Sequence, residues 1–149
     1  MPKMIFVNLP VADVEKSAAF YEAIGATKDE RFSQAGQAAS LQFSDTIVFM
    51  LLSHDFFRTF TPKTIPDARE VAQVLVCLSE DSRQSVDATL DKAVAAGAKG
   101  DPTPKQEMGD FMYGRSFEDP DGHIVELMWM DVDAAMAAWS QPQPETEPA

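Results

Sequence analysis

One stretch near the end of the chain decides the fold: Phe117-Glu118-Asp119-Pro120-Asp121-Gly122-His123-Ile124-Val125-Glu126-Leu127. Its centre, residues 119–122, has the Asp, Pro and Gly that favour a tight turn. Runs of strand-forming residues lie on both sides, over 111–117 and 124–130. The pattern predicts an antiparallel hairpin that closes the fold, followed by a short helix over 132–139.

Working outward from this hairpin, the chain shows the same order of elements twice. The first copy is predicted as a strand over 4–9, a helix from the N-cap Asp13 to about Ile24, and strands over 27–32, 38–43 and 47–52. The second is predicted as a strand over 72–78, a helix over about 79–96, a short strand near 98, and the hairpin strands. Gly25 and Gly97 are natural helix stops at equivalent places. This internal repeat predicts an α+β protein with two βαβββ modules, at about 4–52 and 72–131.

Composition limits the class of protein. The 149 residues suit a single domain, which we place at 1–140, and the Pro-rich acidic tail 141–149 is predicted to be disordered. The chain has 12 Lys and Arg against 24 Asp and Glu, a net charge of −12. That charge argues against nucleic-acid and membrane partners, and it suits a neutral or cationic ligand or simply solubility. With no signal-like or bilayer-length apolar stretch, we expect a cytoplasmic protein. The single cysteine, Cys77, is predicted to be a buried apolar residue.

Three segments carry a family resemblance. These are Leu9–Ser17 with Phe20-Tyr21, the restart at Ala72, and the hairpin over 117–127. Together they resemble the vicinal oxygen chelate superfamily, which includes glyoxalase I, bleomycin-resistance proteins and extradiol dioxygenases. The resemblance covers about residues 4–131. Residues 111–117 and 129–131 are similar to a subgroup labelled predicted lactoylglutathione lyase. The resemblance implies that the modules form a cup-shaped, partly open mixed-sheet barrel, and that the protein is a homodimer.

The resemblance also implies where a divalent metal would bind, on the first and last strands of each module. The matching positions here are Phe6 and Met50 in module one, and Gln73 and Glu126 in module two. Only Gln73 and Glu126 carry a donor for Zn²⁺, Ni²⁺ or Mn²⁺, and a catalytic site needs about three protein ligands. The two histidines do not complete it, because His123 and Glu126 point to opposite faces of a strand and His54 lies in a loop. We therefore expect no cofactor and regard a metal as disfavoured.

Without a metal, the cup becomes an apolar pocket with a few polar groups. Strand alternation gives the predicted lining as Phe6, Asn8, Met50, Gln73, Leu75, Tyr113, Arg115, Glu126 and Met128. Glu126 is the candidate general base, or else a glutamate hydrogen-bonded to Gln73. Tyr113 and Arg115 could hold an anionic group, or Arg115 could pair with a surface carboxylate. A simple barrel core is the alternative for the whole set.

Three functions follow from these patterns. The first is a metal-free protein that binds a small hydrophobic or cationic molecule in its cup, which the apolar segment around Phe56, Phe57 and Phe60 also favours. The second is a metal-dependent enzyme of the lactoylglutathione lyase type. The third is a structural or regulatory homodimer without a ligand.

Overall fold

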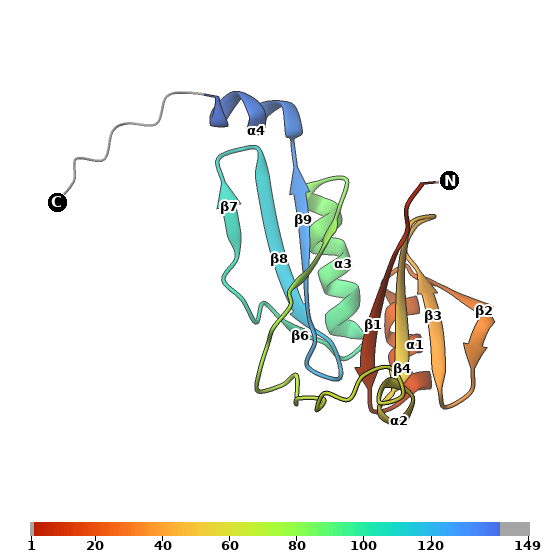
Figure 1. Cartoon of the computed structure of the whole chain (residues 1–149). Coiled ribbons are helices and arrows are strands. Elements are labelled where there is room, and N and C mark those ends of the chain that lie inside the picture. The colour runs from red at the N-terminus through yellow and green to blue at the C-terminus, as the bar shows by residue number, and fades with distance from the viewer. Residues whose placement is uncertain (1, 141–149) are drawn as a thin grey trace.

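Two strand–helix–strands modules follow one another in the computed structural model of the chain, which describes residues 2–140 (Figure 1). Module one contains β1 (Ile5–Val11), α1 (Val14–Ala23), β2 (Thr27–Gln34), β3 (Ala38–Gln42), β4 (Ile47–Ser53) and the short α2 (His54–Phe57). Module two contains β5 (Val76–Ser79), α3 (Arg83–Ala95), β6 (Lys99–Gly100), β7 (Gln106–Met108), β8 (Met112–Glu118), β9 (Ile124–Met130) and α4 (Val132–Trp139). The repeat predicted from the sequence is confirmed. The predicted tail at 141–149 lies outside the described residues.

Each module builds one mixed sheet in the same strand order. In module one the order is β1-β4-β3-β2, with β1 and β4 parallel. In module two it is β5-β9-β8-β6, with β5 and β9 parallel and β7 added to β8. The two sheets remain separate and do not close into a barrel, which is consistent with the partly open α+β architecture expected from the sequence.

The helices begin where their capping residues allow. Asp13 accepts a hydrogen bond from the Lys16 backbone N–H and starts α1, and Ser82 does the same for α3 through Ser85. These side chains satisfy backbone donors that have no partner within the helix. Gly25 and Gly97, with φ of 112° and 108°, follow the two helix ends in a conformation that favours glycine. Equivalent caps and stops thus give both modules the same strand-to-helix turn.

Both modules contribute to one hydrophobic core on the helix side of their sheets. Tyr21, Phe49 and Leu51 are fully buried in module one, and Phe117 and Leu127 are fully buried in module two. The Phe20 and Phe117 rings, from different modules, have centroids 5.6 Å apart in an edge arrangement. The face of each sheet that points away from its helix is called the open face below.

The chain between the modules differs from the sequence prediction. The first strand of module two begins at Val76 rather than at 72, so residues 58–75 form a long connection, here called the linker. Figure 1 shows the linker in yellow-green, leaving α2 and passing the tip of the β8–β9 hairpin. Apolar residues at 71–75 favoured a strand, but they are exposed and make no ladder with β9.

Within residues 2–140 no helix has the length and apolar character needed to cross a lipid bilayer.

Candidate functional site

The β8–β9 hairpin tip joins the two modules. The Tyr21 hydroxyl donates a 2.7 Å hydrogen bond to Asp119 Oδ2, and Asp119 Oδ1 accepts from the backbone N–H groups of Asp121 and His123. Burial raises the pKa of Asp119, and burial together with the Asp119 carboxylate raises the pKa of Tyr21 well above 10. Asp119 therefore has a partner for each carboxylate oxygen inside the core.

The same tip also forms hydrogen bonds with β1 and with the residue that follows it. The Ala12 backbone N–H donates to Asp121 Oδ1 at 2.8 Å, and His123 Nε2 lies 2.8 Å from the Pro10 carbonyl oxygen. His123 is thus occupied by a contact between modules, beside the turn. The hairpin motif that suggests the fold from the sequence serves here to dock module two onto the first strand of module one.

The linker crosses this junction in close contact with Gly122. The Gly122 φ is 97°, and a Cβ built on it would lie 2.5 Å from the Arg69 backbone N and 2.7 Å from the Ala68 carbonyl carbon. Arg69 Nη2 also donates to the Pro120 carbonyl oxygen at 2.9 Å. Only a glycine gives the linker backbone this room. The hairpin tip therefore fixes the middle of the linker.

A cavity of about 510 Å³ lies between β1, the start of β9 and the linker, and is called the junction cavity below. Its lining is Val7, Asn8, Leu9, Pro10, Phe57, Thr61, Lys63, Thr64, Ile65, Pro66, Ala68, Val71, Ala72, Gln73, Val74, Val76, Gly122, His123, Ile124 and Val125. Most of these side chains are aliphatic. The volume and the apolar lining with a few polar groups are typical of sites for small molecules.

The open face of module two has a far smaller hollow. A space of about 20 Å³ lies beside Glu126, lined by Cys77, Gly114, Met128 and their neighbours, and no residue of module one contributes to it. Cys77 is exposed rather than buried as predicted, since its side chain faces away from α3, next to Glu126. Partial burial and the Glu126 carboxylate raise the pKa of the Cys77 thiol, which keeps it protonated.

The strand registers also change the predicted metal positions. Met50 pairs with Asn8 on β1, and Glu126 pairs with Cys77 on β5. With Asp13 and Ser82 as equivalent caps, Leu75 is the counterpart of Phe6, two residues after the predicted Gln73. The sequence alignment slipped because the apolar run that starts at 72 has no residue that marks the start of β5.

The donor set at these positions does not fit a divalent metal. A phenyl ring at Phe6, an alkyl chain at Leu75 and a thioether at Met50 leave Glu126 as the single oxygen donor. Across residues 2–140, no group of three or more His, Cys, Asp and Glu side chains has an arrangement that could hold a metal ion. His54 and His123 do line one cavity of about 290 Å³ beside Asp67 and Asp121.

Tyr113 and Arg115 were predicted to line the cup. The structure directs their polar groups to the opposite, helix-facing side of β8, although Arg115 also borders the small hollow beside Glu126. Ser116, not Arg115, pairs with Glu126. The Tyr113 hydroxyl donates to Asp87 Oδ1 on α3 at 2.6 Å, and Arg115 pairs with Asp87 at 3.0 Å and with Asp101 at 2.6 Å. Arg115 therefore lies between two acidic residues, as in the alternative in which it pairs with a surface carboxylate.

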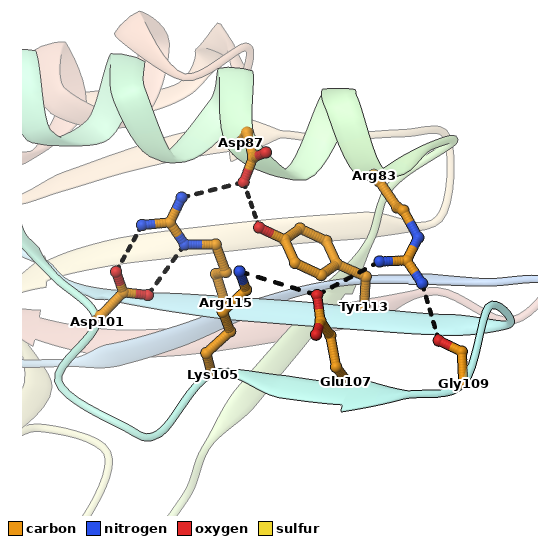
Figure 2. A network of polar contacts seen from close by, with 8 residues as sticks. All are labelled: Arg83, Asp87, Asp101, Lys105, Glu107, Gly109, Tyr113 and Arg115. Atoms are coloured by element: carbon orange, nitrogen blue, oxygen red, sulfur yellow. Dashed lines mark hydrogen bonds and ion pairs between the residues drawn. The ribbon is translucent and has the colours of Figure 1, made fainter.

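These residues belong to a surface network that ties β7 and the preceding loop to α3 (Figure 2). Arg83 approaches Glu107 at 3.5 Å, donates to the Gly109 carbonyl at 3.0 Å, and lies over the rings of Tyr113 and Trp129. The hydrogen bond from Tyr113 and the charge of Arg115 lower the pKa of Asp87, and Arg115 lowers that of Asp101. With every charge matched by an opposite one, the network is structural.

Of the predicted lining, only Asn8 and Gln73 reach the junction cavity. Sequence analysis missed the linker contribution, including Lys63, Ile65, Val71 and Val74. The signal was present, because a long connection with several aliphatic residues is unusual for an exposed loop. The same apolar residues at 72–75 also fit a strand, and this pattern conceals their place in the linker.

The comparisons with known proteins agree with the fold. The model of the Glyoxalase/Bleomycin resistance protein/Dioxygenase superfamily matches residues 3–127. A hypothetical protein from S. aureus superposes with a TM-score of 0.70 at 25% identity, over 87% of this chain and 94% of the other. No curated protein sequence matches the chain.

Two further solved structures share the fold at lower identity. A glyoxalase/bleomycin resistance protein/dioxygenase family enzyme from Burkholderia phytofirmans PsJN has a TM-score of 0.68 and 19% identity, over 85% of this chain and 98% of its own. A lactoylglutathione lyase from Agrobacterium tumefaciens has a TM-score of 0.61 and 16% identity, over 86% and 93%. With a family model that spans most of its length, the chain belongs to the glyoxalase/bleomycin resistance protein/dioxygenase superfamily.

Proposed function

We propose that this protein binds a small apolar molecule in the junction cavity, and that binding needs no metal ion. The observation that carries the proposal is the cavity of about 510 Å³ with a mainly aliphatic lining drawn from both modules and the linker. Burial of apolar ligand surface would supply the free energy of binding, at roughly 25 cal/mol per Å² before the cost of association.

The experiment is a fluorescence titration with N-phenyl-1-naphthylamine, a neutral apolar probe. We expect saturable binding at one site per chain. Ala72 lines the cavity from an exposed part of the linker, so Ala72→Phe fills cavity space without disturbing the core. That variant should weaken binding strongly. Ala137→Phe, which adds the same ring to an exposed position of α4, is the matched control and should bind as wild type does.

Two outcomes would contradict the proposal. One is the absence of saturable binding. The other is binding that Ala72→Phe and Ala137→Phe leave equally unchanged, since the probe would then occupy another surface. Glu126→Ala should have no effect, because Glu126 does not line the junction cavity. A loss of binding in that variant would move the site to the open face.

An enzyme of the lactoylglutathione lyase type is the alternative, and the donor set argues against it. Such chemistry requires a metal at the positions occupied here by Phe6, Leu75, Met50 and Glu126, where a single carboxylate remains. The similarity to the Agrobacterium lyase, at 16% identity, supports the fold alone. We therefore treat catalysis as the weaker proposal.

We also propose that the protein is a homodimer. Ile5 and Phe6 on β1 and Leu75 directly before β5 are 55%, 54% and 49% exposed, which is unusual for large apolar side chains. A second copy of the chain would cover them. Sedimentation velocity should show a dimer for wild type and a monomer for the double variant Phe6→Glu, Leu75→Glu. A wild-type monomer at micromolar concentration would refute this.

A further inference from the structure

The polar groups of the junction cavity point to one kind of ligand. Four side chains with hydrogen-bonding capacity and no partner among the described residues line it: Asn8, Lys63, Thr64 and Gln73. Lys63 is the one charged residue of the lining, and no carboxylate lines the cavity. His123 also lines it, but its Nε2 is already bound to the Pro10 carbonyl.

Lys63 is distinguished by its place rather than by the lack of an ion pair. Like Lys3, Lys16, Lys92 and Lys99, it is an exposed lysine that forms no ion pair within residues 2–140, but it is the lysine that lines a cavity without a carboxylate. The chain carries twice as many acidic as basic residues, so a free ammonium beside an apolar cavity without an acid is locally exceptional. Within a distance of about 8 Å, the Debye length at physiological salt, such a nearby charge counts more than the net charge of the whole protein.

We infer that the ligand of this cavity is an amphiphilic anion, an apolar body that carries a carboxylate which pairs with Lys63. The inference rests on the binding function proposed above. The inferred ligand charge is negative, which is opposite to the cationic ligand that the net charge of the chain suited. The aliphatic walls formed by Val7, Leu9 and Ile124 take the apolar body, and the amides of Asn8 and Gln73 can donate to a second oxygen.

The test compares three probes that share one alkyl chain and differ in charge: decanoate, decanol and decylammonium. Each is titrated by calorimetry below its micellar concentration, at neutral pH and fixed salt. For wild type we expect decanoate to bind about fivefold more tightly than decanol, as one partly exposed ion pair allows. Decylammonium should bind more weakly than decanol, because it would place a second cation beside Lys63.

Two lysine variants separate the site from the overall charge. Lys63→Met keeps the length and apolar stem of the side chain and removes its charge, so decanoate and decanol should then bind alike. Lys16→Met removes the same charge from an exposed position on α1 that does not line the cavity, and it should leave the preference for decanoate intact.

The outcomes distinguish this inference from the proposed function. If decanol binds and Ala72→Phe blocks it, while decanoate shows no advantage that Lys63→Met removes, the cavity binds apolar molecules and the anionic class is wrong. If Lys16→Met and Lys63→Met lower decanoate affinity equally, the effect is one of net charge, and Lys63 is not the partner of the carboxylate. If none of the three probes binds, the proposed function itself fails. If Ala72→Phe changes the oligomeric state instead, the cavity is part of a subunit interface and both fail.

Discussion

Tyr21 and Asp119 form a buried hydrogen bond between the modules, from a helix of module one to the hairpin tip of module two. Tyr21 is fully buried and Asp119 is 4% exposed. Tyr21→Phe removes the donor and leaves Asp119 Oδ2 without a partner in the core. We expect the free energy of unfolding to fall by about 1–3 kcal/mol, the cost of an unsatisfied buried polar group.

Urea denaturation measures this loss, and Tyr113→Phe is its matched control. The Tyr113 hydroxyl bonds Asp87, whose carboxylate is 49% exposed and can bind water instead. The control should therefore lose less stability. Equal losses in the two variants would show that the hydrogen bond between the modules contributes no more to the free energy of unfolding than the surface hydrogen bond of Tyr113.

The stability contributed by Asp119 should depend on pH in a defined direction. Burial raises its pKa in the folded protein, so the unfolded chain loses this proton first as pH rises. The contribution is fully present below the unfolded value near 3.8 and is lost as pH rises through the folded value. Asp119→Asn removes this titration. Wild type should therefore gain stability relative to Asp119→Asn as pH falls from 7 toward 3.8, as measured by urea denaturation. A difference that stays constant over this range would contradict the prediction.

Gly122→Ala should destabilise the junction. A left-handed backbone alone costs a non-glycine residue roughly 1–2 kcal/mol, and the new Cβ would also clash with the linker backbone. Gly36→Ala is the control, because Gly36 has a φ of 72° and no atom within 4 Å of a built Cβ. Thermal denaturation should show the larger loss for Gly122→Ala, together with weaker binding of the naphthylamine probe. An equal loss in both variants would mean that the linker backbone moves away from the new Cβ without a loss of stability.

Arg115→Met tests the surface network of Figure 2. Its partners Asp87 and Asp101 have lowered pKa values, so their contribution is present above the ordinary value of 3.8 and is lost as pH falls through the lower, folded values. We expect a loss of up to about 1 kcal/mol at neutral pH, since the pairs are partly exposed. The difference from wild type should shrink below pH 3.8. Arg31→Met, which removes a guanidinium whose side chain is 79% exposed and which pairs with one carboxylate, should change stability less.

Metal binding should be weak and independent of Glu126. Elemental analysis of the purified protein is expected to give less than one equivalent of Ni, Zn or Mn. Calorimetric titration of each ion should show no tight site in wild type or Glu126→Ala. Tight binding of one equivalent that Glu126→Ala abolishes would show that a partner subunit or other side chains complete a site.

Most elements of this fold are predicted from the sequence because they have a local signal, whereas the short α2 and β7 were not predicted. The caps Asp13 and Ser82, the stops Gly25 and Gly97, and the turn at 119–122 lie where short-range chemistry alone decides the conformation. The final strand over 124–130 and the helix over 132–139 were predicted with their observed bounds.

The site was less predictable because it depends on contacts between distant segments. Strand alternation gives two faces but does not say which one packs against the helix, so Tyr113 and Arg115 were assigned to the wrong side of β8. The linker has apolar residues but no periodicity, and its contacts with the hairpin tip at Gly122 and Pro120 bring it over the cavity. A local pattern has no means to show that contact.

The two bonds that join the hairpin tip to β1 also bear on how the molecule assembles. They link residues 109 and 113 positions apart in the chain. Contacts so distant carry a large loop-closure cost and form late, as in proteins of high contact order. During synthesis, β1 can pair with β4, but its contacts with the hairpin tip form only after the last strands have left the ribosome. The junction cavity should therefore be the last part of the protein to form, and a nascent or truncated chain should expose its walls to chaperones.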